Sequence, residues 1–168
     1  MKTTLWATLT ANGNYAQSSA SNPPKPETLA DFAAQATATG NFVVGRRTFE
    51  AFAAGGGPRL ANVDVVVVSS QLAGVPGVKV VATPREALAH LAATGHQAAM
   101  IAGGATLHNA CLADGLVDEL VFNIAPVLEG KGHQLLIDQA AYRHQDIALV
   151  ASRPLGGGVI QLHYRLAR

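Results

Sequence analysis

The sequence is poor in cysteine, in aromatic residues and in charge. One cysteine, Cys111, stands among 168 residues, while aromatic side chains make up 5% of the chain and charged ones 14%. A single cysteine cannot form an internal disulfide, and the chain shows no tight cluster of histidine and cysteine that would indicate a structural zinc site. These absences exclude a disulfide-rich secreted scaffold and favour a reducing compartment.

Charge of one sign and long apolar runs are also missing. The formal net charge is +1, and no run of basic residues is longer than Arg46-Arg47, so we expect no nucleic-acid partner. No uninterrupted apolar run approaches the roughly 18 residues that a membrane helix needs, and the first residues lack the apolar core of a signal peptide. We therefore expect a cytoplasmic protein without a membrane segment.

What the chain has in quantity is apolar residues, which make up 49% of it. This fraction, combined with low charge, excludes disorder as the main state. The length is close to the usual size of one domain, and two smaller units would have poor surface-to-volume ratios. The sequence therefore predicts a single domain over residues 1–168.

Apolar, β-branched segments alternate with helical ones along most of the chain. We predict strands over residues 3–10, 41–45, 63–68, 78–81, 98–102 and 117–124, and helices over residues 27–37, 48–54, 84–93 and 106–112. The almost wholly apolar strand 63–68 is expected at the centre of the sheet. Residues 147–152 and 159–166 flank a glycine-rich turn and predict a terminal hairpin. The pattern indicates a three-layer α/β fold, with helices on both faces of a mostly parallel sheet and an antiparallel edge.

Three expected strand-to-helix junctions carry residues suited to phosphate groups. They are Gly45-Arg46-Arg47-Thr48, Ser69-Ser70-Gln71 and Gly103-Gly104-Ala105-Thr106. Glycine lets the backbone approach a ligand, helix N-termini present free N–H groups, and arginine offers a fork of donors. Each junction alone has an ordinary structural interpretation as a turn or a solvated surface, but together they outline a dinucleotide site. The chain has neither G-x-G-x-x-G nor a P-loop, so the site belongs to another kind.

These motifs resemble the dihydrofolate reductase-like superfamily over nearly the whole chain. Residues 42–50 are similar to its apolar strand followed by G-R-x-T-[FWY]-E, residues 65–71 to its strand ending in S-S-Q, and residues 100–107 to its pyrophosphate turn. Residues 115–120 and 124–132 are closer to one branch, the reductase domain of riboflavin-biosynthesis deaminase/reductases. The order and the spacing of the motifs agree with this resemblance.

The resemblance implies NADPH as cofactor and assigns roles to these motifs. Gly45, Arg46, Arg47 and Thr48 would hold phosphates, Ser69, Ser70 and Gln71 would surround the adenosine ribose with its 2′-phosphate, and Gly103, Gly104, Ala105 and Thr106 would bind the pyrophosphate. Trp6 and Ala7 match the place where the family holds the nicotinamide amide. Asn12, Gly13, Asn14 and Tyr15 begin the family's mobile loop near the substrate. Trp6 and Tyr15 are equally compatible with a role as plain core aromatics.

The chain departs from the family pattern at two places. Folate-reducing members carry an acid on the first helix, where this chain has Thr28; Glu27 or Asp31 would have to substitute, although acids in a first helical turn usually complement the helix dipole. The riboflavin branch typically shows S-L-D-G on the first loop, where this chain has Thr10-Ala11-Asn12-Gly13. Thr28, Asp31 and Glu27 are therefore the candidate catalytic residues.

The resemblance implies an NADPH-dependent reductase that acts on a pyrimidine or pteridine compound. The first candidate substrate is the ribosylaminopyrimidine phosphate of riboflavin biosynthesis, with Lys25 and Arg59 as the available cations for its phosphate. The alternatives are a dihydrofolate reductase and a non-catalytic NADPH-binding module. A homodimer is also implied, with the apolar terminal hairpin as the edge to cover. We assign no metal, because the six histidines lack metal-ligand spacing, and we expect Cys111 to be a core residue.

Overall fold

The computed structural model describes residues 1–16, 22–56, 60–72, 74–130, 132 and 144–167. The strands are β1 (Lys2–Thr10), β2 (Asn41–Gly45), β3 (Asp64–Val68), β4 (Lys79–Val81), β5 (Ala98–Ile101), β6 (Glu119–Ala125), β7 (Ile147–Gly156) and β8 (Val159–Leu166). The helices are α1 (Pro26–Thr39), α2 (Arg46–Ala51), α3 (Pro84–Ala93) and α4 (Ala105–Ala113), with a short π-helical segment over Phe52–Gly56 after α2. None of the helices among these residues is long and apolar enough to cross a membrane.

The eight strands form one sheet in the order β4-β3-β2-β5-β1-β6-β8-β7. Neighbouring strands from β4 to β6 run parallel, whereas β8 runs antiparallel to β6 and β7 antiparallel to β8. The carboxyl ends of the six parallel strands therefore share one edge of the sheet, with β1 and β5 at its middle. This confirms the predicted mostly parallel sheet with an antiparallel C-terminal hairpin.

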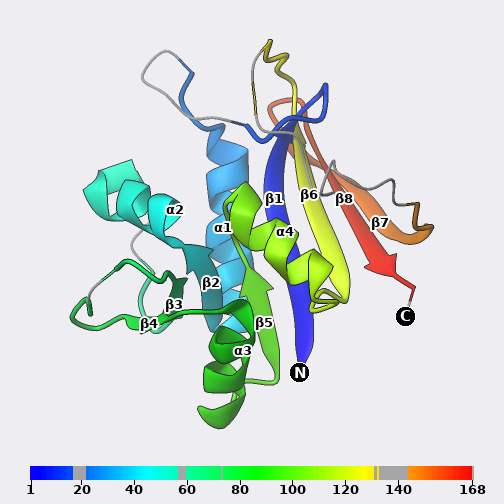
Figure 1. Cartoon of the computed structure of the whole chain (residues 1–168). Helices are drawn as coiled ribbons and strands as arrows, with labels where there is room; N and C mark the ends of the chain where they lie inside the picture. Colours follow the sequence, from blue (N-terminus) through cyan, green and yellow to red (C-terminus); the bar gives the residue numbers. More distant parts are fainter. Residues whose placement is uncertain (17–21, 57–59, 73, 131, 133–143, 168) are drawn as a thin grey trace.

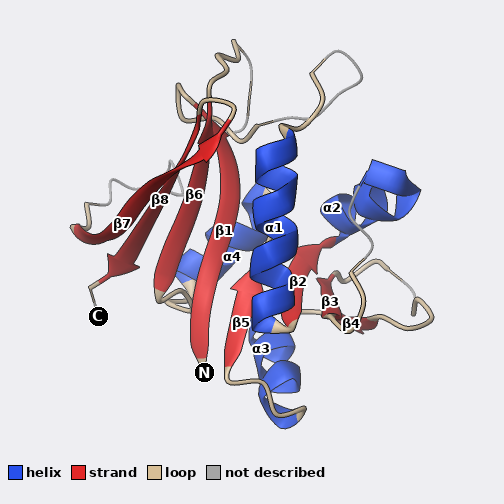
Figure 2. Cartoon of the chain, turned by 180° about the vertical axis from the view of Figure 1, so that it is seen from behind, coloured by secondary structure: helices blue, strands red, loops and turns tan. Residues whose placement is uncertain are grey.

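Helices cover both faces of the sheet, which confirms the three layers. Side chains of β1 alternate between two core clusters: Leu5 and Ala7 pack with residues of α3 and α4, whereas Trp6 packs with Phe32 of α1. Figure 1 shows α3 and α4 on the near face, and Figure 2, turned by 180°, shows α1 crossing the opposite one. Each face of the central strands is thus buried under a different helix.

Helix α1 begins and ends where its sequence dictates. Pro26 occupies the first turn, where its missing N–H costs nothing and its fixed φ suits the helix. Gly40 ends the helix in the left-handed conformation, and its N–H donates to the Ala36 carbonyl at 2.9 Å. The buried residues Thr28, Asp31, Phe32 and Ala36 form the stripe that faces the sheet.

The expected central position of the 63–68 strand is wrong. Strand β3 lies next to the edge strand β4, although Val66 and Val67 are fully buried, one in each core cluster. An apolar run indicates that both faces of a strand are covered, but it does not indicate how far the strand lies from the edge of the sheet. Here both faces of β3 are covered, although β3 is only the second strand from the edge.

The structure also corrects two local predictions. No helix starts after β3 within the described residues: Ser69 Oγ accepts hydrogen bonds from the Gln71 and Leu72 N–H groups, and the chain turns towards β4. The strand predicted over 147–152 continues to Gly156 through Pro154, and the ladder shifts register there. An edge strand tolerates proline because its outward N–H needs no partner in the sheet.

Candidate active site

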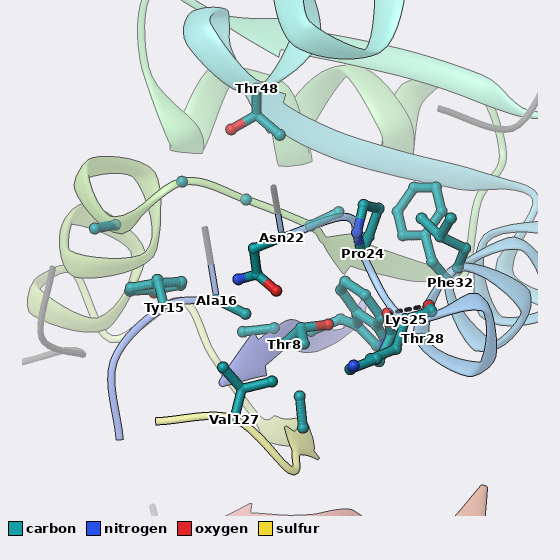
Figure 3. A pocket seen from close by; sticks show the side chains of 18 of the residues that line it. Thr8, Tyr15, Ala16, Asn22, Pro24, Lys25, Thr28, Phe32, Thr48 and Val127 are labelled. Carbon is teal, nitrogen blue, oxygen red and sulfur yellow. Dashed lines mark hydrogen bonds between the residues drawn. The ribbon is translucent and has the colours of Figure 1, made fainter. Parts of the chain in front are cut away.

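A cavity of about 330 Å³ opens at the carboxyl edge of the central strands. Its wall combines residues of β1, the segment after β1, the start of α1, the α2 region, the β5–α4 turn and the end of β6 (Figure 3). The lining residues that the prediction had singled out are Trp6, Ala7, Tyr15, Lys25, Thr28, Thr48, Gly103, Gly104 and Ala105. Loops at the carboxyl ends of parallel strands are where α/β sheets commonly bind ligands.

Two of the three predicted phosphate junctions are in direct contact. The Gly45 N–H at the end of β2 donates to the Gly103 carbonyl at 2.9 Å, and the Ala102 N–H donates to the Val43 carbonyl at 2.8 Å. These bonds extend the pairing of β2 and β5 beyond the last residue of β5. They set the Gly103-Gly104 turn beside Thr48 in the first turns of α2.

The Gly103-Gly104 turn depends on glycine. Both residues have positive φ, +148° and +79° respectively. A Cβ on Gly104 would lie 3.2 Å from Thr48 Oγ1, and one on Gly103 would lie 3.4 Å from Thr48 Cγ2. The turn therefore brings bare backbone against Thr48 at the cavity wall.

The chemistry of this turn fits the pyrophosphate of a dinucleotide. Gly104 is the N-cap of α4 and has no side chain with which to cap that helix. The first N–H groups of α4 thus remain available to an anion, and the helix dipole favours negative charge at that end. Ala105 lines the cavity at the same point, whereas Thr106 is exposed and does not line it.

The remaining cofactor candidates lie beyond the cavity wall. Arg46 is half-buried and pairs with Glu50 one turn later, at 3.7 Å, while Arg47 is exposed. Ser69 and the exposed Ser70 and Gln71 follow β3, the neighbour of β2, at the same edge of the sheet. The polar residues that follow β2 and β3 therefore continue the carboxyl edge of the sheet outward from the cavity.

Trp6 is held by a buried polar network on the far side of its indole ring. Its Nε1–H donates to Asp31 Oδ2 at 2.8 Å, and the same oxygen accepts from the Asn123 and Gln161 side-chain amides, each at 2.8 Å. The Arg153 guanidinium donates to the other Asp31 oxygen at 3.2 Å. The network fixes Trp6 between α1 and the sheet, so that the ring forms part of the cavity wall.

The three candidate catalytic residues separate in space. Thr28 lines the cavity, is buried, and donates its hydroxyl to the Lys25 carbonyl at 2.8 Å. The Asp31 carboxylate belongs to the Trp6 network and does not line the cavity. Glu27 lies against the hairpin turn, where a Cβ on Gly157 would be 2.5 Å from its Oε1. Of the three, Thr28 alone is part of the cavity wall.

The loop candidates divide in the same way. Asn12 and Asn14 both donate their side-chain amides to the Glu129 carbonyl, at 2.9 and 3.0 Å, and so tie the first loop to the segment after β6. Gly13 has φ +85° in the turn between them, and neither it nor the two asparagines line the cavity. Tyr15 does line it. Lys25 lies at the cavity, whereas Arg59 falls outside the described residues.

Sequence reasoning did not find His108, which is fully buried and lines the cavity. The Tyr15 hydroxyl and His108 Nδ1 are hydrogen-bonded at 2.5 Å. Burial lowers the pKa of His108 to about 4, with the Ile101 carbonyl acting in the opposite direction, and burial raises the pKa of Tyr15. The available signal was the position of His108 beside Leu107, on the apolar side of a helix that starts at the Gly-Gly turn.

Two further side-chain chemistries find little support in this site. Burial, together with the nearby Asp114 charge, raises the pKa of the Cys111 thiol to about 12, so this buried residue stays a thiol at neutral pH. Among the described residues no group of three or more His, Cys, Asp or Glu side chains is arranged to hold a metal ion.

The sheet order, the antiparallel hairpin and the cavity at the parallel edge define the chain as a three-layer α/β domain with a cavity of ligand size, in agreement with the dihydrofolate reductase-like resemblance of its sequence. Residues 3–161 match the family model described as the RibD C-terminal domain. The chain belongs to this family. The match supports a reductase-like role of the riboflavin-biosynthesis type.

Solved structures show the same fold at low sequence identity. A crystal structure from Shewanella sp. PV-4, whose name assigns the protein to riboflavin biosynthesis, has a TM-score of 0.80 at 21% identity over 100% of both chains. A pyrimidine reductase-like protein from Corynebacterium diphtheriae has a TM-score of 0.76 at 18% identity, over 99% of this chain and 92% of the other. Acinetobacter baumannii RibD has a TM-score of 0.73 at 17% identity, over 99% of this chain and 58% of the other. A search of curated protein sequences finds no match.

Proposed function

We propose that the chain is an NADPH-dependent reductase that transfers a hydride to a pyrimidine-type substrate, 5-amino-6-(5-phosphoribosylamino)uracil first among them. The observation that carries the proposal is the single cavity wall shared by Trp6 and Ala7 of β1, the Gly103-Gly104 turn and Thr28 of α1. Backbone suited to a pyrophosphate and an apolar wall suited to a flat ring thus meet in one place. The family match supports the same reaction class.

When bound, the nicotinamide would supply the hydride, which is chemistry that the protein itself lacks. The chain's part is binding and orientation. The first N–H groups of α4 would hold the pyrophosphate, and the main chain at Trp6 and Ala7 would orient the nicotinamide amide. The packed aromatic rings of Trp6 and Phe32, 5.3 Å apart in an edge-to-face contact, would exclude water from one wall. Reacting carbons must be held about 3–3.5 Å apart for efficient transfer.

Cofactor selectivity is assigned to Arg46 and Arg47. A 2′-phosphate carries roughly −1.5 to −2 charge by analogy with other phosphate monoesters, and guanidinium groups bind such charge with strong hydrogen bonds. Arg46→Ala and Arg47→Ala should therefore raise the Kd for NADPH about tenfold and leave the Kd for NADH nearly unchanged. Arg85→Ala is the matched control, because Arg85 pairs with Asp114 on the α3–α4 side. Equal losses for both nucleotides would contradict this assignment.

The substrate assignment depends on the α1 side of the cavity. Thr28 stands where folate-reducing relatives carry an acid, and the Asp31 carboxylate already accepts hydrogen bonds from side chains that include those of Trp6, Asn123, Gln161 and Arg153. Both observations favour the ribosylaminopyrimidine over dihydrofolate. Lys25 is the one Lys or Arg side chain among the described residues that line the cavity, and we assign it to the substrate phosphate.

The deciding experiment measures NADPH oxidation by absorbance with each of three compounds: the ribosylaminopyrimidine phosphate, its dephosphorylated form and dihydrofolate. We expect turnover with the first, a raised KM with the second and none with the third. Turnover of dihydrofolate alone would overturn the substrate assignment. Binding of NADPH without turnover of any of the three would identify a non-catalytic module, and no NADPH binding at all would overturn the proposal.

We also propose that the protein is a cytoplasmic homodimer. The support is the outer hairpin, whose edge strand β7 exposes Leu149 and Val150, with Ile160 exposed on β8. An apolar sheet edge of this length is normally covered by a partner.

A further inference from the structure

The hydrogen bond between Tyr15 and His108 joins two segments far apart in the sequence. Tyr15 folds back on β1 through an isolated bridge to Leu9, and the Ala16 N–H donates to the Thr8 carbonyl at 3.0 Å. His108 lies in α4, where its N–H donates to the carbonyl of the N-cap, Gly104. The pair therefore fastens the segment after β1 to the helix that starts at the Gly-Gly turn.

Both members of the pair are neutral at neutral pH. Burial lowers the pKa of His108 to about 4, and burial raises that of Tyr15 above its ordinary value. His108 Nε2 has no hydrogen-bond partner within the described part of the chain. A neutral, buried imidazole that is hydrogen-bonded to the hydroxyl holds this hydroxyl in a fixed position.

The hydrogen bond with His108 uses only one of the hydrogen-bonding capacities of the Tyr15 hydroxyl. A phenol can donate one hydrogen bond and also accept, and the imidazole uses one of these capacities in either ring tautomer. Tyr15 is half-buried and lines the cavity, as does His108. Among the described residues the hydroxyl makes no other hydrogen bond, so its remaining capacity is available to a polar group bound in the cavity.

The position of Tyr15 in the cavity determines which end of a bound molecule its side chain can contact. In Figure 3, Tyr15 lies at one side of the cavity with Ala16 near it, Thr8 lies in the middle, and Thr28 and Phe32 lie at the other side. Tyr15 thus stands between the cavity residues of β1 and the start of α4. Under the proposed function, these two elements hold the nicotinamide amide and the pyrophosphate, and the nicotinamide ribose would lie between them.

We propose that the Tyr15 hydroxyl, held in place by His108, binds a polar group at the nicotinamide end of the dinucleotide. Tyr15 is then a cofactor-contacting residue, and His108 is a positioning residue that acts through it. This inference rests on the proposed function, and the riboflavin-type resemblance assigns neither the hydrogen bond nor the role of His108.

The test measures the Kd for NADPH by fluorescence titration, without a second substrate. Tyr15→Phe should raise the Kd about five- to tenfold, the loss typical of one buried hydrogen bond. His108→Leu, which fills a similar volume without a partner for the hydroxyl, should raise it comparably. His108→Asn should restore part of the affinity, because the amide can reach the hydroxyl from nearly the same position as Nδ1. The double variant Tyr15→Phe/His108→Leu should lose no more than Tyr15→Phe alone.

Two controls separate this role from a structural one. Tyr164→Phe removes a hydroxyl from β8, away from the cavity lining, and should leave the Kd unchanged. Adenosine 2′,5′-bisphosphate, which carries only the adenosine end of the cofactor, should bind wild type and Tyr15→Phe equally. A uniform loss for both ligands would show a general distortion of the site and overturn the inference.

The failure of this inference differs from that of the proposed function. If wild type binds NADPH and Tyr15→Phe has the same Kd, the role of Tyr15 is disproved while the reductase proposal stands. If the effects of Tyr15→Phe and His108→Leu simply add, His108 does not act through Tyr15. If wild type binds no NADPH, the cofactor assignment and this inference fail together.

Discussion

Gly104 is the residue at which backbone conformation and ligand binding are most tightly joined. At φ +79°, an alanine would be strained by about 1–3 kcal/mol, and its Cβ would press on Thr48 Oγ1 from 3.2 Å. We predict that Gly104→Ala lowers the free energy of unfolding by about 2 kcal/mol and raises the Kd for NADPH at least tenfold. Urea denaturation and fluorescence titration measure the two effects.

Gly95→Ala is the matched control for that variant. Gly95 has φ +95° beyond the end of α3, with no atom within 4 Å of an added Cβ. The same kind of backbone strain should therefore cost stability without changing NADPH affinity. If the two variants weakened NADPH binding equally, the assignment of the Gly103-Gly104 turn to the pyrophosphate would be contradicted.

Asp31 is the residue whose interpretation changes most between sequence and structure. Its side chain is 4% exposed and accepts hydrogen bonds from Trp6, Asn123, Gln161 and Arg153. Asp31→Asn replaces an acceptor by an amide that faces other donors, which should cost about 2–3 kcal/mol of unfolding free energy. Trp6 is the sole tryptophan, so a shift in its emission reports directly on the loss of its fixed position.

Glu27→Gln provides the comparison on the same helix. Glu27 lies beside the hairpin turn and takes no part in the Trp6 network, so stability and tryptophan emission should stay close to wild type. An Asp31→Asn variant that kept both properties but lost turnover would instead point to a catalytic carboxylate.

At the scale of elements, periodicity and turn residues predicted the strands β1 to β8 and the helices α1 to α4, whereas the helix expected after β3 is absent from the described residues. Helix α3 shows this well, since Thr83 caps it by accepting from the Glu86 N–H and Pro84 opens it. Position in the sheet was harder, as with β3, because burial on both faces does not encode lateral order. Strand β7 extends to Gly156, beyond the predicted end at Ser152, because an edge strand accommodates Pro154.

Strands β1, β6 and β8 contribute to a charge cluster outside the cavity, in which Glu119 is buried and Lys2 and Arg165 are exposed. Glu119 is 4% exposed and contacts Lys2 Nζ at 2.9 Å, His163 Nε2 at 2.8 Å and Arg165 Nε at 3.4 Å. Burial alone would raise the pKa of Glu119, but hydrogen bonds and charge from Lys2 and His163 outweigh it and hold the pKa below the ordinary value.

A lowered pKa in the folded state makes a stability contribution that is present above the unfolded-state pKa and is lost as pH falls through the folded one. We predict that wild type loses stability as the pH falls below about 4.5, the ordinary value for this carboxyl group. In Glu119→Gln this part of the pH dependence should be absent. Asp146→Asn, which alters a side chain that is 98% exposed, should keep it. Urea denaturation at a series of pH values measures the difference.

At the scale of the whole molecule, topology assembled a site that spacing alone could only suggest. The glycine and arginine junctions were visible in the sequence, and the parallel order of β2 and β5 brought Gly45 and Gly103 into contact. The pairing of Tyr15 with His108 had no sequence signal, because it depends on a loop folding back over β1. That Thr28 lines the cavity, and neither Glu27 nor Asp31 does, likewise depended on helix rotation, which a shift of one residue changes by about 100°.

The outer hairpin leaves apolar side chains of the edge strand β7 exposed, and we expect a second copy of the chain to cover them. Leu149 is 58% exposed and Ile147 39% exposed on β7, whose outer edge has no strand partner within the described residues. We predict a dimer by light scattering, and Leu149→Glu should shift the mass to that of a single chain, because a buried unpaired charge is costly at an interface. Leu128→Glu changes an equally apolar residue that is 79% exposed but belongs to the segment after β6 and not to the two hairpin strands, and should leave the dimer intact. A wild-type protein that is monomeric at all concentrations would disprove the dimer. A dimer that persists in Leu149→Glu and dissociates in Leu128→Glu would show that the interface lies elsewhere.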